Sequence, residues 1–163
     1  MNPCPCGNYG TRKECICTPQ QLIKYRRKIS GPIVDRIDMW VEVGNVEYKT
    51  LAGEGRRGAE SKVVREKIAQ ARERQAKRFA EAKLPHKTNS ELTARDIDKH
   101  IKLENDLREL LNQSATKLGL SGRAYHRVIK LARTIADLDE NNNIKQSHLL
   151  EALSYRPKQM QSM

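Results

Sequence analysis

Helical spacing of apolar residues dominates the second half of the chain. After residue 90, apolar positions recur every three or four residues, and polar breaks separate the repeats. Gly119 is expected to end one helix and Ser121 to cap the next. The pattern predicts a small bundle of four helices, at about 93 to 100, about 103 to 118, 121 to 138 and 147 to 155.

The helix expected at 121 to 138 has two chemically different faces. One face is the expected core stripe, made of Val128, Leu131, Ala132, Ile135 and Leu138. The other is a basic strip in which Arg123, Arg127 and Lys130 recur at three- and four-residue spacing. The pattern itself does not separate a functional strip from ordinary solvated surface.

A long, heavily charged helix is expected from Ala59 to Lys83. Its apolar stripe is narrow and consists of Val64, Ile68, Ala71, Gln75, Phe79 and Ala82. Between Arg56 and Lys87 there are eleven Lys or Arg residues and four Glu residues. Two interpretations stay open, an exposed helix solvated by its charges and a helix that contacts nucleic acid.

The first half of the chain combines short elements with a linker. Thr18 and Pro19 form a helix start, and helical spacing continues over 19 to 29. A short helical piece then turns into a period-two pattern that predicts a β-strand, with Ile37, Met39, Val41 and Val43 on one face. Three glycines within 50 to 58 predict a mobile linker.

Charge changes this picture by pointing to a polyanionic partner. The 163 residues include 31 Lys or Arg against 20 Asp or Glu, a formal net charge of +11, and 4% aromatic residues. This balance favours nucleotide or nucleic acid over carbohydrate. The chain has no run of eighteen apolar residues and no basic region followed by an apolar one at its start. We therefore expect a cytoplasmic protein without a membrane segment.

All four cysteines lie near the N-terminus, in two Cys-x-Cys arms formed by Cys4 with Cys6 and Cys15 with Cys17. The arms can converge on one tetrahedral Zn²⁺, for which four sulfurs are suitable ligands. The alternatives are two disulfides, which need an oxidising compartment, or four free thiols. Zinc is favoured, and because four sulfurs leave no open coordination position, its role would be structural.

No sequence motif for catalysis stands out. A phosphate-binding Walker A loop is absent, and the glycine-rich stretch at 53 to 62 has Ala-Glu where Lys-Ser/Thr must stand. His86, His100, His126 and His148 share no ligand spacing and are expected at the surface or at its boundary.

Three motifs, in order, carry a family resemblance: Met1-Asn2-Pro3-Cys4-Pro5-Cys6-Gly7, the stretch 30 to 38 (SGPIVDRID) and the stretch 120 to 138 (LSGRAYHR through ARTIADL). They resemble the C-terminal portion of the magnesium-chelatase-like AAA+ ATPases of the ComM (YifB) group. Members of this group are longer and carry their Walker motifs upstream. The resemblance therefore implies a fragment that cannot hydrolyse ATP alone.

The resemblance implies a mainly α fold, with a four-helix AAA+ lid-type bundle preceded by a long charged helix, a short β-strand and a small zinc-binding loop. The implied domains are a Cys4 zinc-binding loop at 1–18, the end of the AAA+ large subdomain at 19–50, a glycine linker and long basic helix at 51–90, and the helical lid at 91–163.

The resemblance also implies roles for three polar residues. Arg36 matches the arginine finger, which acts in trans on a neighbour's nucleotide, Arg123 matches sensor 2, and Asn2 matches sensor 1. Taken without the family, Arg36 would pair locally with Asp35 or Asp38, and Asn2 would belong to an ordinary Asn-Pro turn. ATP and Mg²⁺ are expected only in the full-length protein.

The resemblance implies that the intact protein forms a homo-oligomeric ring, expected to be a hexamer, that couples ATP hydrolysis to DNA remodelling such as branch migration in natural transformation or recombination. The fragment itself would be a monomer. Two rival hypotheses are a free-standing zinc-containing nucleic-acid-binding module without enzymatic activity and a helical partner-binding protein. Salt-dependent DNA binding by the isolated chain distinguishes the first rival.

Overall fold

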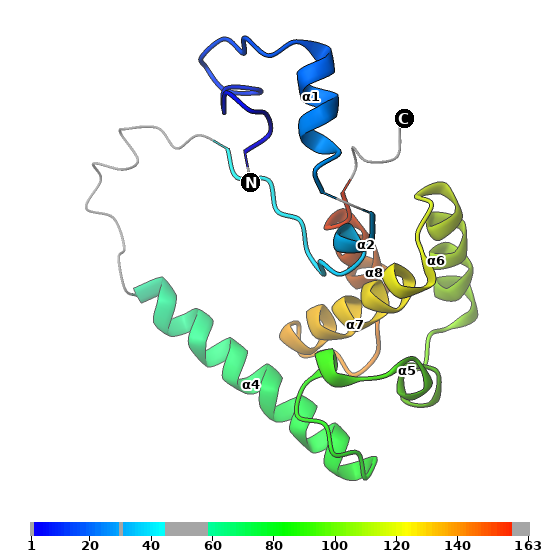
Figure 1. Cartoon of the computed structure of the whole chain (residues 1–163). Coiled ribbons are helices and arrows are strands. Elements are labelled where there is room, and N and C mark those ends of the chain that lie inside the picture. Colours follow the sequence, from blue (N-terminus) through cyan, green and yellow to red (C-terminus); the bar gives the residue numbers. More distant parts are fainter. Residues whose placement is uncertain (1, 30, 45–58, 158–163) are drawn as a thin grey trace. The chain divides into compact units, whose positions relative to one another are not determined.

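The computed structural model describes residues 2–29, 31–44 and 59–157. The fold is mainly helical, as predicted (Figure 1). The chain divides into two compact units, the first within residues 1–37 and 41–54 and the second within 38–40 and 55–163. The linker predicted at 50–58 lies outside the described residues.

The first unit contains the cysteine loop and two short helices, α1 (Pro19–Arg26) and α2 (Gly31–Val34). The start of α1 confirms the prediction, because the Thr18 hydroxyl accepts a hydrogen bond from the Gln21 amide at 3.3 Å and the Gln21 side chain accepts one from the Thr18 amide at 2.9 Å. The helix ends three residues before the predicted position 29.

The strand predicted over 37–43 is wrong for the described residues, where the chain forms no β-ladder. Met39, Val41 and Val43 are 43%, 65% and 86% exposed. A strand needs a neighbouring strand that pairs with its N–H and C=O groups along its length, whereas the Trp40 amide bonds to the carbonyl of Tyr155, just after helix α8, at 2.9 Å. The period-two pattern indicates which side chains would share one side of an extended segment, but it does not indicate whether a neighbouring strand is present to pair with it.

The second unit contains the helices predicted from apolar spacing, each within two residues of its predicted ends. They are α4 (Ala59–Glu81), α5 (Ala94–His100), α6 (Asn105–Lys117), α7 (Gly122–Leu138) and α8 (Gln146–Ser154). A 3-10 turn, η1 (Asn89–Glu91), was not predicted. Ser121 caps α7 through its hydroxyl, and Gly119 follows α6 at φ +57°.

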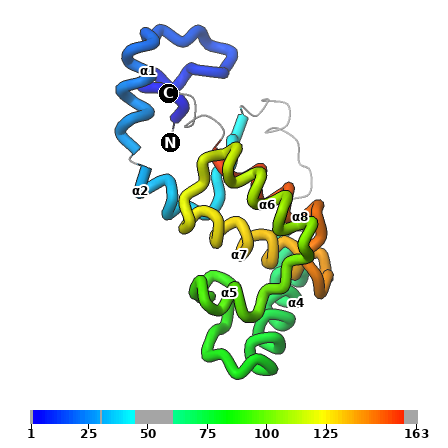
Figure 2. Tube along the Cα trace, turned by 90° about the vertical axis from the view of Figure 1, so that its right-hand side faces the viewer, coloured from blue at the N-terminus to red at the C-terminus, as the bar shows by residue number. Residues whose placement is uncertain are grey.

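The central element of the second unit is α7, which contacts α4, η1, α5 and α8, while α6 packs on α8. Figures 1 and 2 show α7 beside α8, with the C-terminal end of α7 facing α4. Of the predicted core stripe, Val128, Ala132 and Ile135 are buried, but Leu138 is 41% exposed. Since neighbours surround α7 on several sides, its buried face is wider than one stripe.

Only part of α4 packs against the rest of the second unit. Ala71, Gln75 and Phe79 are buried, whereas Val64 and Ile68 are 53% and 43% exposed. The spacing of the predicted apolar stripe is therefore correct, but only its C-terminal half is covered by other helices, and Val64 and Ile68 remain exposed. Gln75 fits the stripe because its side-chain oxygen accepts the backbone N–H of Asn89 at 3.1 Å.

A buried carboxylate joins α4 to α7. Asp137 is 1% exposed and accepts hydrogen bonds from both Nη groups of Arg78 and, at 2.9 Å, from the side-chain amide of Asn89. One turn before Asp137 on α7, Arg133 approaches the same carboxylate to 3.0 Å and also donates to the carbonyls of Asn141 and Asn142. This network fixes α4, α7 and the turn after α7 together. Sequence reasoning missed it.

We expect Asp137→Asn to lower the free energy of unfolding by about 3 kcal/mol, because two guanidinium groups lose the charge that compensates their burial. Urea unfolding followed by circular dichroism measures the change. The matched control is Glu140→Gln, which removes a carboxylate 62% exposed that pairs with Arg74 at 3.0 Å. It should cost less than about 1 kcal/mol. Equal losses in the two variants would contradict the role assigned to Asp137.

Candidate functional site

The four cysteines converge in the first unit, as predicted. Their sulfur atoms all lie within 4.8 Å of one another, with 3.4 Å from Cys4 to Cys6, 3.6 Å from Cys6 to Cys15 and 3.7 Å from Cys4 to Cys15. These separations are too long for disulfide bonds, and all four thiols are free. A tetrahedral ion with metal–sulfur bonds of about 2.3 Å has sulfurs about 3.8 Å apart. The cluster therefore fits a metal ion.

Backbone groups of the loop support this cluster. The amide of Tyr9 donates to the sulfur of Cys4 at 3.3 Å, and Cys4 is fully buried. Between the two arms the chain turns through Gly7 at φ +80° and Gly10 at φ +75°, a region that favours glycine. The guanidinium of Arg26 lies 5.6 Å from the centre of the Tyr9 ring, which connects the loop to α1.

The thiols differ in acidity. At Cys6, the backbone amide of Asn8 is the largest influence and, with hydrogen bonds from the other thiols, lowers the pKa to about 6. At Cys15, the amide of Cys17 lowers the pKa, but burial and hydrogen bonds to Cys6 and Cys4 outweigh it and raise the pKa to about 12. Four thiolates this close repel one another, so binding of a cation and loss of the remaining protons are coupled.

The residue predicted as an arginine finger is available for an external ligand. Arg36 follows α2, is exposed, and donates to the carbonyl of Pro32 at 3.2 Å. The alternative of a local ion pair is wrong within the described residues, since neither Asp35 nor Asp38 pairs with Arg36. Asp38 pairs instead with Arg127 of α7.

The two predicted sensor residues are also exposed. Arg123 occupies the first turn of α7, and no described residue forms an ion pair with it. Asn2 lies at the start of the cysteine loop. Arg36 and Asn2 belong to the first unit and Arg123 to the second, and each unit is described by itself.

The predicted basic strip on α7 is not uniform surface. Arg123 has no ion-pair partner in the described part of the chain, but Arg127 pairs with Asp38, and the Lys130 ammonium donates to the carbonyl of Ser90 at 3.0 Å. One histidine also differs from expectation. His148 is 2% exposed, and its Nδ1 accepts the backbone N–H of Lys145 at 3.0 Å, which caps the start of α8. Both corrections arise from tertiary or capping contacts that periodicity does not encode.

The cysteine cluster and Arg36 lie in a region that matches one protein family, and the helical second unit matches the C-terminal part of the same family. A family model described as "Magnesium chelatase, subunit ChlI" matches residues 1–51, and one described as "Magnesium chelatase, subunit ChlI C-terminal" matches residues 58–156. The chain belongs to this magnesium chelatase family.

Within the family, the chain is similar to competence protein ComM of Haemophilus influenzae, with 42% identity over 157 residues that cover 96% of this chain and 29% of that protein. The uncharacterized protein YifB of Escherichia coli K12 is 39% identical over the same shares. An uncharacterized protein of Mycobacterium tuberculosis is 29% identical, covering 95% of this chain and 30% of that protein. The chain thus spans less than a third of the length of these relatives.

Among the helices of the described residues, none combines the length and the apolar character needed to cross a membrane.

We expect the chain, purified under reducing conditions, to carry one metal ion, and Cys15→Ser to lose it, because a tetrahedral site that loses one thiolate binds far more weakly. Elemental analysis measures the ion, and amide hydrogen exchange reports the consequence. Exchange should accelerate across residues 2–18 and remain unchanged in α7. Lys13→Ser, an exposed position in the same loop, is the control. A metal-free wild-type chain would contradict the assignment.

Proposed function

We propose that this chain is the C-terminal part of a ring-forming AAA+ ATPase that couples ATP hydrolysis to DNA remodelling, such as branch migration in natural transformation or recombination. The observation that carries the proposal is Arg36, an exposed arginine without a carboxylate partner among the described residues, within a region that matches the magnesium chelatase family. Because its guanidinium is exposed, Arg36 can contact a phosphate held by another molecule.

In this proposal Arg36 reaches the γ-phosphate held by a neighbouring subunit. Its planar guanidinium can donate two parallel hydrogen bonds to phosphate oxygens and stabilise the charge that develops during phosphoryl transfer. Arg123 acts as sensor 2 on the same class of ligand, and Asn2 acts as sensor 1, where a neutral amide orients the attacking water. ATP and Mg²⁺ bind in the complete protein, since the motif that cradles phosphates is absent from this chain.

The metal ion of the cysteine cluster is proposed to be zinc. Four sulfur ligands at tetrahedral spacing suit Zn²⁺, and with all four positions filled no site remains to activate water. The zinc therefore stiffens the 1–18 loop and takes no part in hydrolysis. The remaining proposed domains are the end of the large subdomain at 19–50, a linker and basic helix at 51–90, and the lid at 91–163.

The ring, proposed as a hexamer, would bring DNA into contact with many subunits at once. The net charge of +11 supports a polyanionic partner, and residues 61–70 of α4, which include Lys62, Arg65 and Lys67, are all exposed. The same exposed helix favours a second candidate function, a free-standing zinc-containing module that binds nucleic acid without enzymatic activity.

DNA binding by the isolated chain separates the two candidates. A ring component should bind a DNA duplex no tighter than about 1 μM at 0.15 M salt, because a single subunit supplies few phosphate contacts. Fluorescence anisotropy over a salt series measures the affinity and its slope. Binding near 10 nM with sequence preference would instead favour the free-standing module.

The proposed ATPase role is tested by Arg36→Ala in the longer protein that carries the nucleotide-binding portion. ATP turnover should fall about a thousandfold, while ATP affinity changes little, because the finger acts on the transition state. The control is Arg27→Ala, an exposed arginine directly after α1.

Mixed rings test separately whether Arg36 acts on the nucleotide of a neighbouring subunit. Arg36→Ala subunits should recover part of the turnover when mixed with subunits that carry Arg36 but cannot bind ATP, since each supplies what the other lacks. Unchanged turnover in the pure Arg36→Ala protein would contradict the assignment, and absence of recovery in mixed rings would contradict action on a neighbour.

A further inference from the structure

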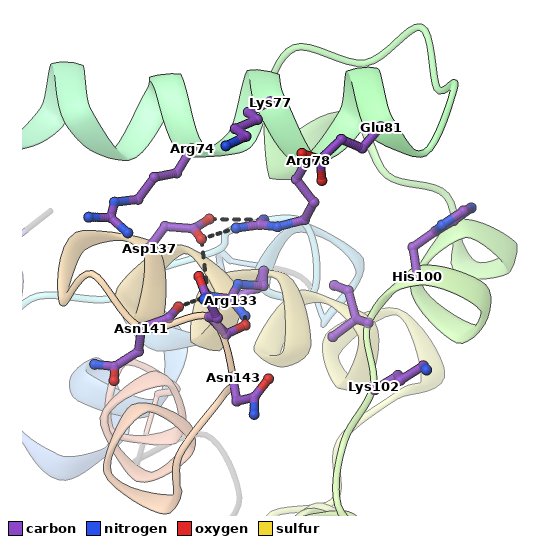
Figure 3. A pocket seen from close by; sticks show the side chains of 12 residues that line it. Arg74, Lys77, Arg78, Glu81, His100, Lys102, Arg133, Asp137, Asn141 and Asn143 are labelled. Carbon is purple, nitrogen blue, oxygen red and sulfur yellow. Dashed lines mark hydrogen bonds and ion pairs between the residues drawn. The ribbon is translucent and has the colours of Figure 1, made fainter.

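The second unit contains a cavity of about 560 Å³ beside the C-terminal half of α4. Figure 3 shows its walls: side chains of α4 on one side, the end of α5 with the residue pair that follows it, and α7 with the turn after it. Five of its lining side chains are Lys or Arg, namely Arg74, Lys77, Arg78, Lys102 and Arg133. His100 adds an imidazole, and three asparagines add side-chain amides.

Negative charge in the cavity is smaller and mostly committed. The two lining carboxylates are Glu81 and Asp137, and Asp137 is already neutralised by Arg78 and Arg133. Lys77 and Lys102 have no ion-pair partner within the described part of the chain. The cavity therefore carries uncompensated positive charge, which attracts an anionic ligand.

A buried donor points to the same kind of ligand. Arg133 is 5% exposed, and its Nη groups bond to Asp137 and to the carbonyls of Asn141 and Asn142. Its Nε–H is buried and finds no acceptor among the described residues. Buried donors in proteins almost always have a partner, either an ordered water or a ligand, so this donor is available to an oxygen atom that enters beside Arg133.

We propose that this cavity binds phosphate groups. Phosphate oxygens accept hydrogen bonds from guanidinium and ammonium groups, and the charge of phosphate matches the free lysines. The cavity is larger than one phosphate needs and is lined mainly by polar groups, which favours consecutive phosphates over an apolar ligand. These come either from a free polyphosphate, such as that of a nucleotide, or from a DNA backbone.

The site is separate from the proposed ATPase residues, because neither Arg36 nor Arg123 lines it. Only a DNA source for the phosphates rests on the proposed function. A continuous series of phosphates on DNA would be met by the cations of α4 that lie outside the cavity, such as Lys67, whereas a free polyphosphate would engage the cavity alone.

The test uses the isolated chain with sodium tripolyphosphate at constant ionic strength, read by NMR of the arginine Nε–H groups. We expect the Arg133 Nε–H signal to shift on titration. The double variant Lys77→Gln with Lys102→Gln should weaken binding by about tenfold or more. Its matched control, Arg72→Gln with Lys99→Gln, removes the same charge from exposed positions that do not line the cavity and should change affinity less than about twofold.

A short DNA duplex, titrated at low salt, identifies the source. If the duplex shifts Arg133 Nε–H and the cavity variant loses more affinity than its control, the phosphates belong to DNA. If only tripolyphosphate does so, the ligand is a free polyphosphate. An unshifted Arg133 signal with both ligands, or equal losses in the two double variants, would overturn the proposal. Neither result involves ATP hydrolysis, so failure here is distinct from failure of the Arg36 experiment.

Discussion

A carboxylate that leaves water must be neutralised by its neighbours, and in the second unit Asp137 meets this requirement with two arginines from different helices. Arg78 comes from α4, so the charge requirement and the burial of Phe79 together dock α4 onto α7. Arg133 also binds two carbonyls of the turn after α7, so the same carboxylate fixes the approach to α8. The surplus of one guanidinium in this network adds to the positive charge that Lys77 and Lys102 bring to the cavity beside it.

The first unit depends on a different kind of constraint. Cys4 and Val34 are its only buried residues in the described part, and α1 buries none. An apolar core this small contributes little free energy of folding, and four thiols at van der Waals distance add electrostatic strain as they ionise. A bound metal ion would replace the repulsion between the ionised sulfurs with metal–sulfur bonds, and these bonds would add the stability that the small apolar core does not supply. With the proposed metal ion bound, the loop would gain its order from coordination, whereas the second unit gains its order from packing.

Helices and the cysteine cluster could be predicted because their signals are local. Thr18 and Ser121 cap helices through contacts three residues away, and the cysteine arms are separated by only eight residues. The strand at 37–43 failed because pairing needs a distant partner, and the N-terminal stripe of α4 extends past its covering helices. Asp137 lies 59 residues from Arg78 along the chain, so the sequence alone did not indicate that the two residues form a buried pair. The available signal was that Asp137 lies four residues after Arg133 on α7, next to alanines of the buried face, which is the spacing of an ion pair on the core side of a helix.

Some arginines of this chain have structural partners, whereas the two in the family-matched motifs are exposed. Arg78, Arg127 and Arg133 pair with carboxylates and hold elements together, whereas Arg36 and Arg123 are exposed in the matched motifs and have no ion-pair partner among the described residues. An unpaired guanidinium at a surface contributes little to its own fold, but it remains available for a phosphate presented by another molecule. The matched motifs are why we propose nucleotide chemistry at Arg36 and Arg123, and the exposure of both side chains is compatible with that proposal.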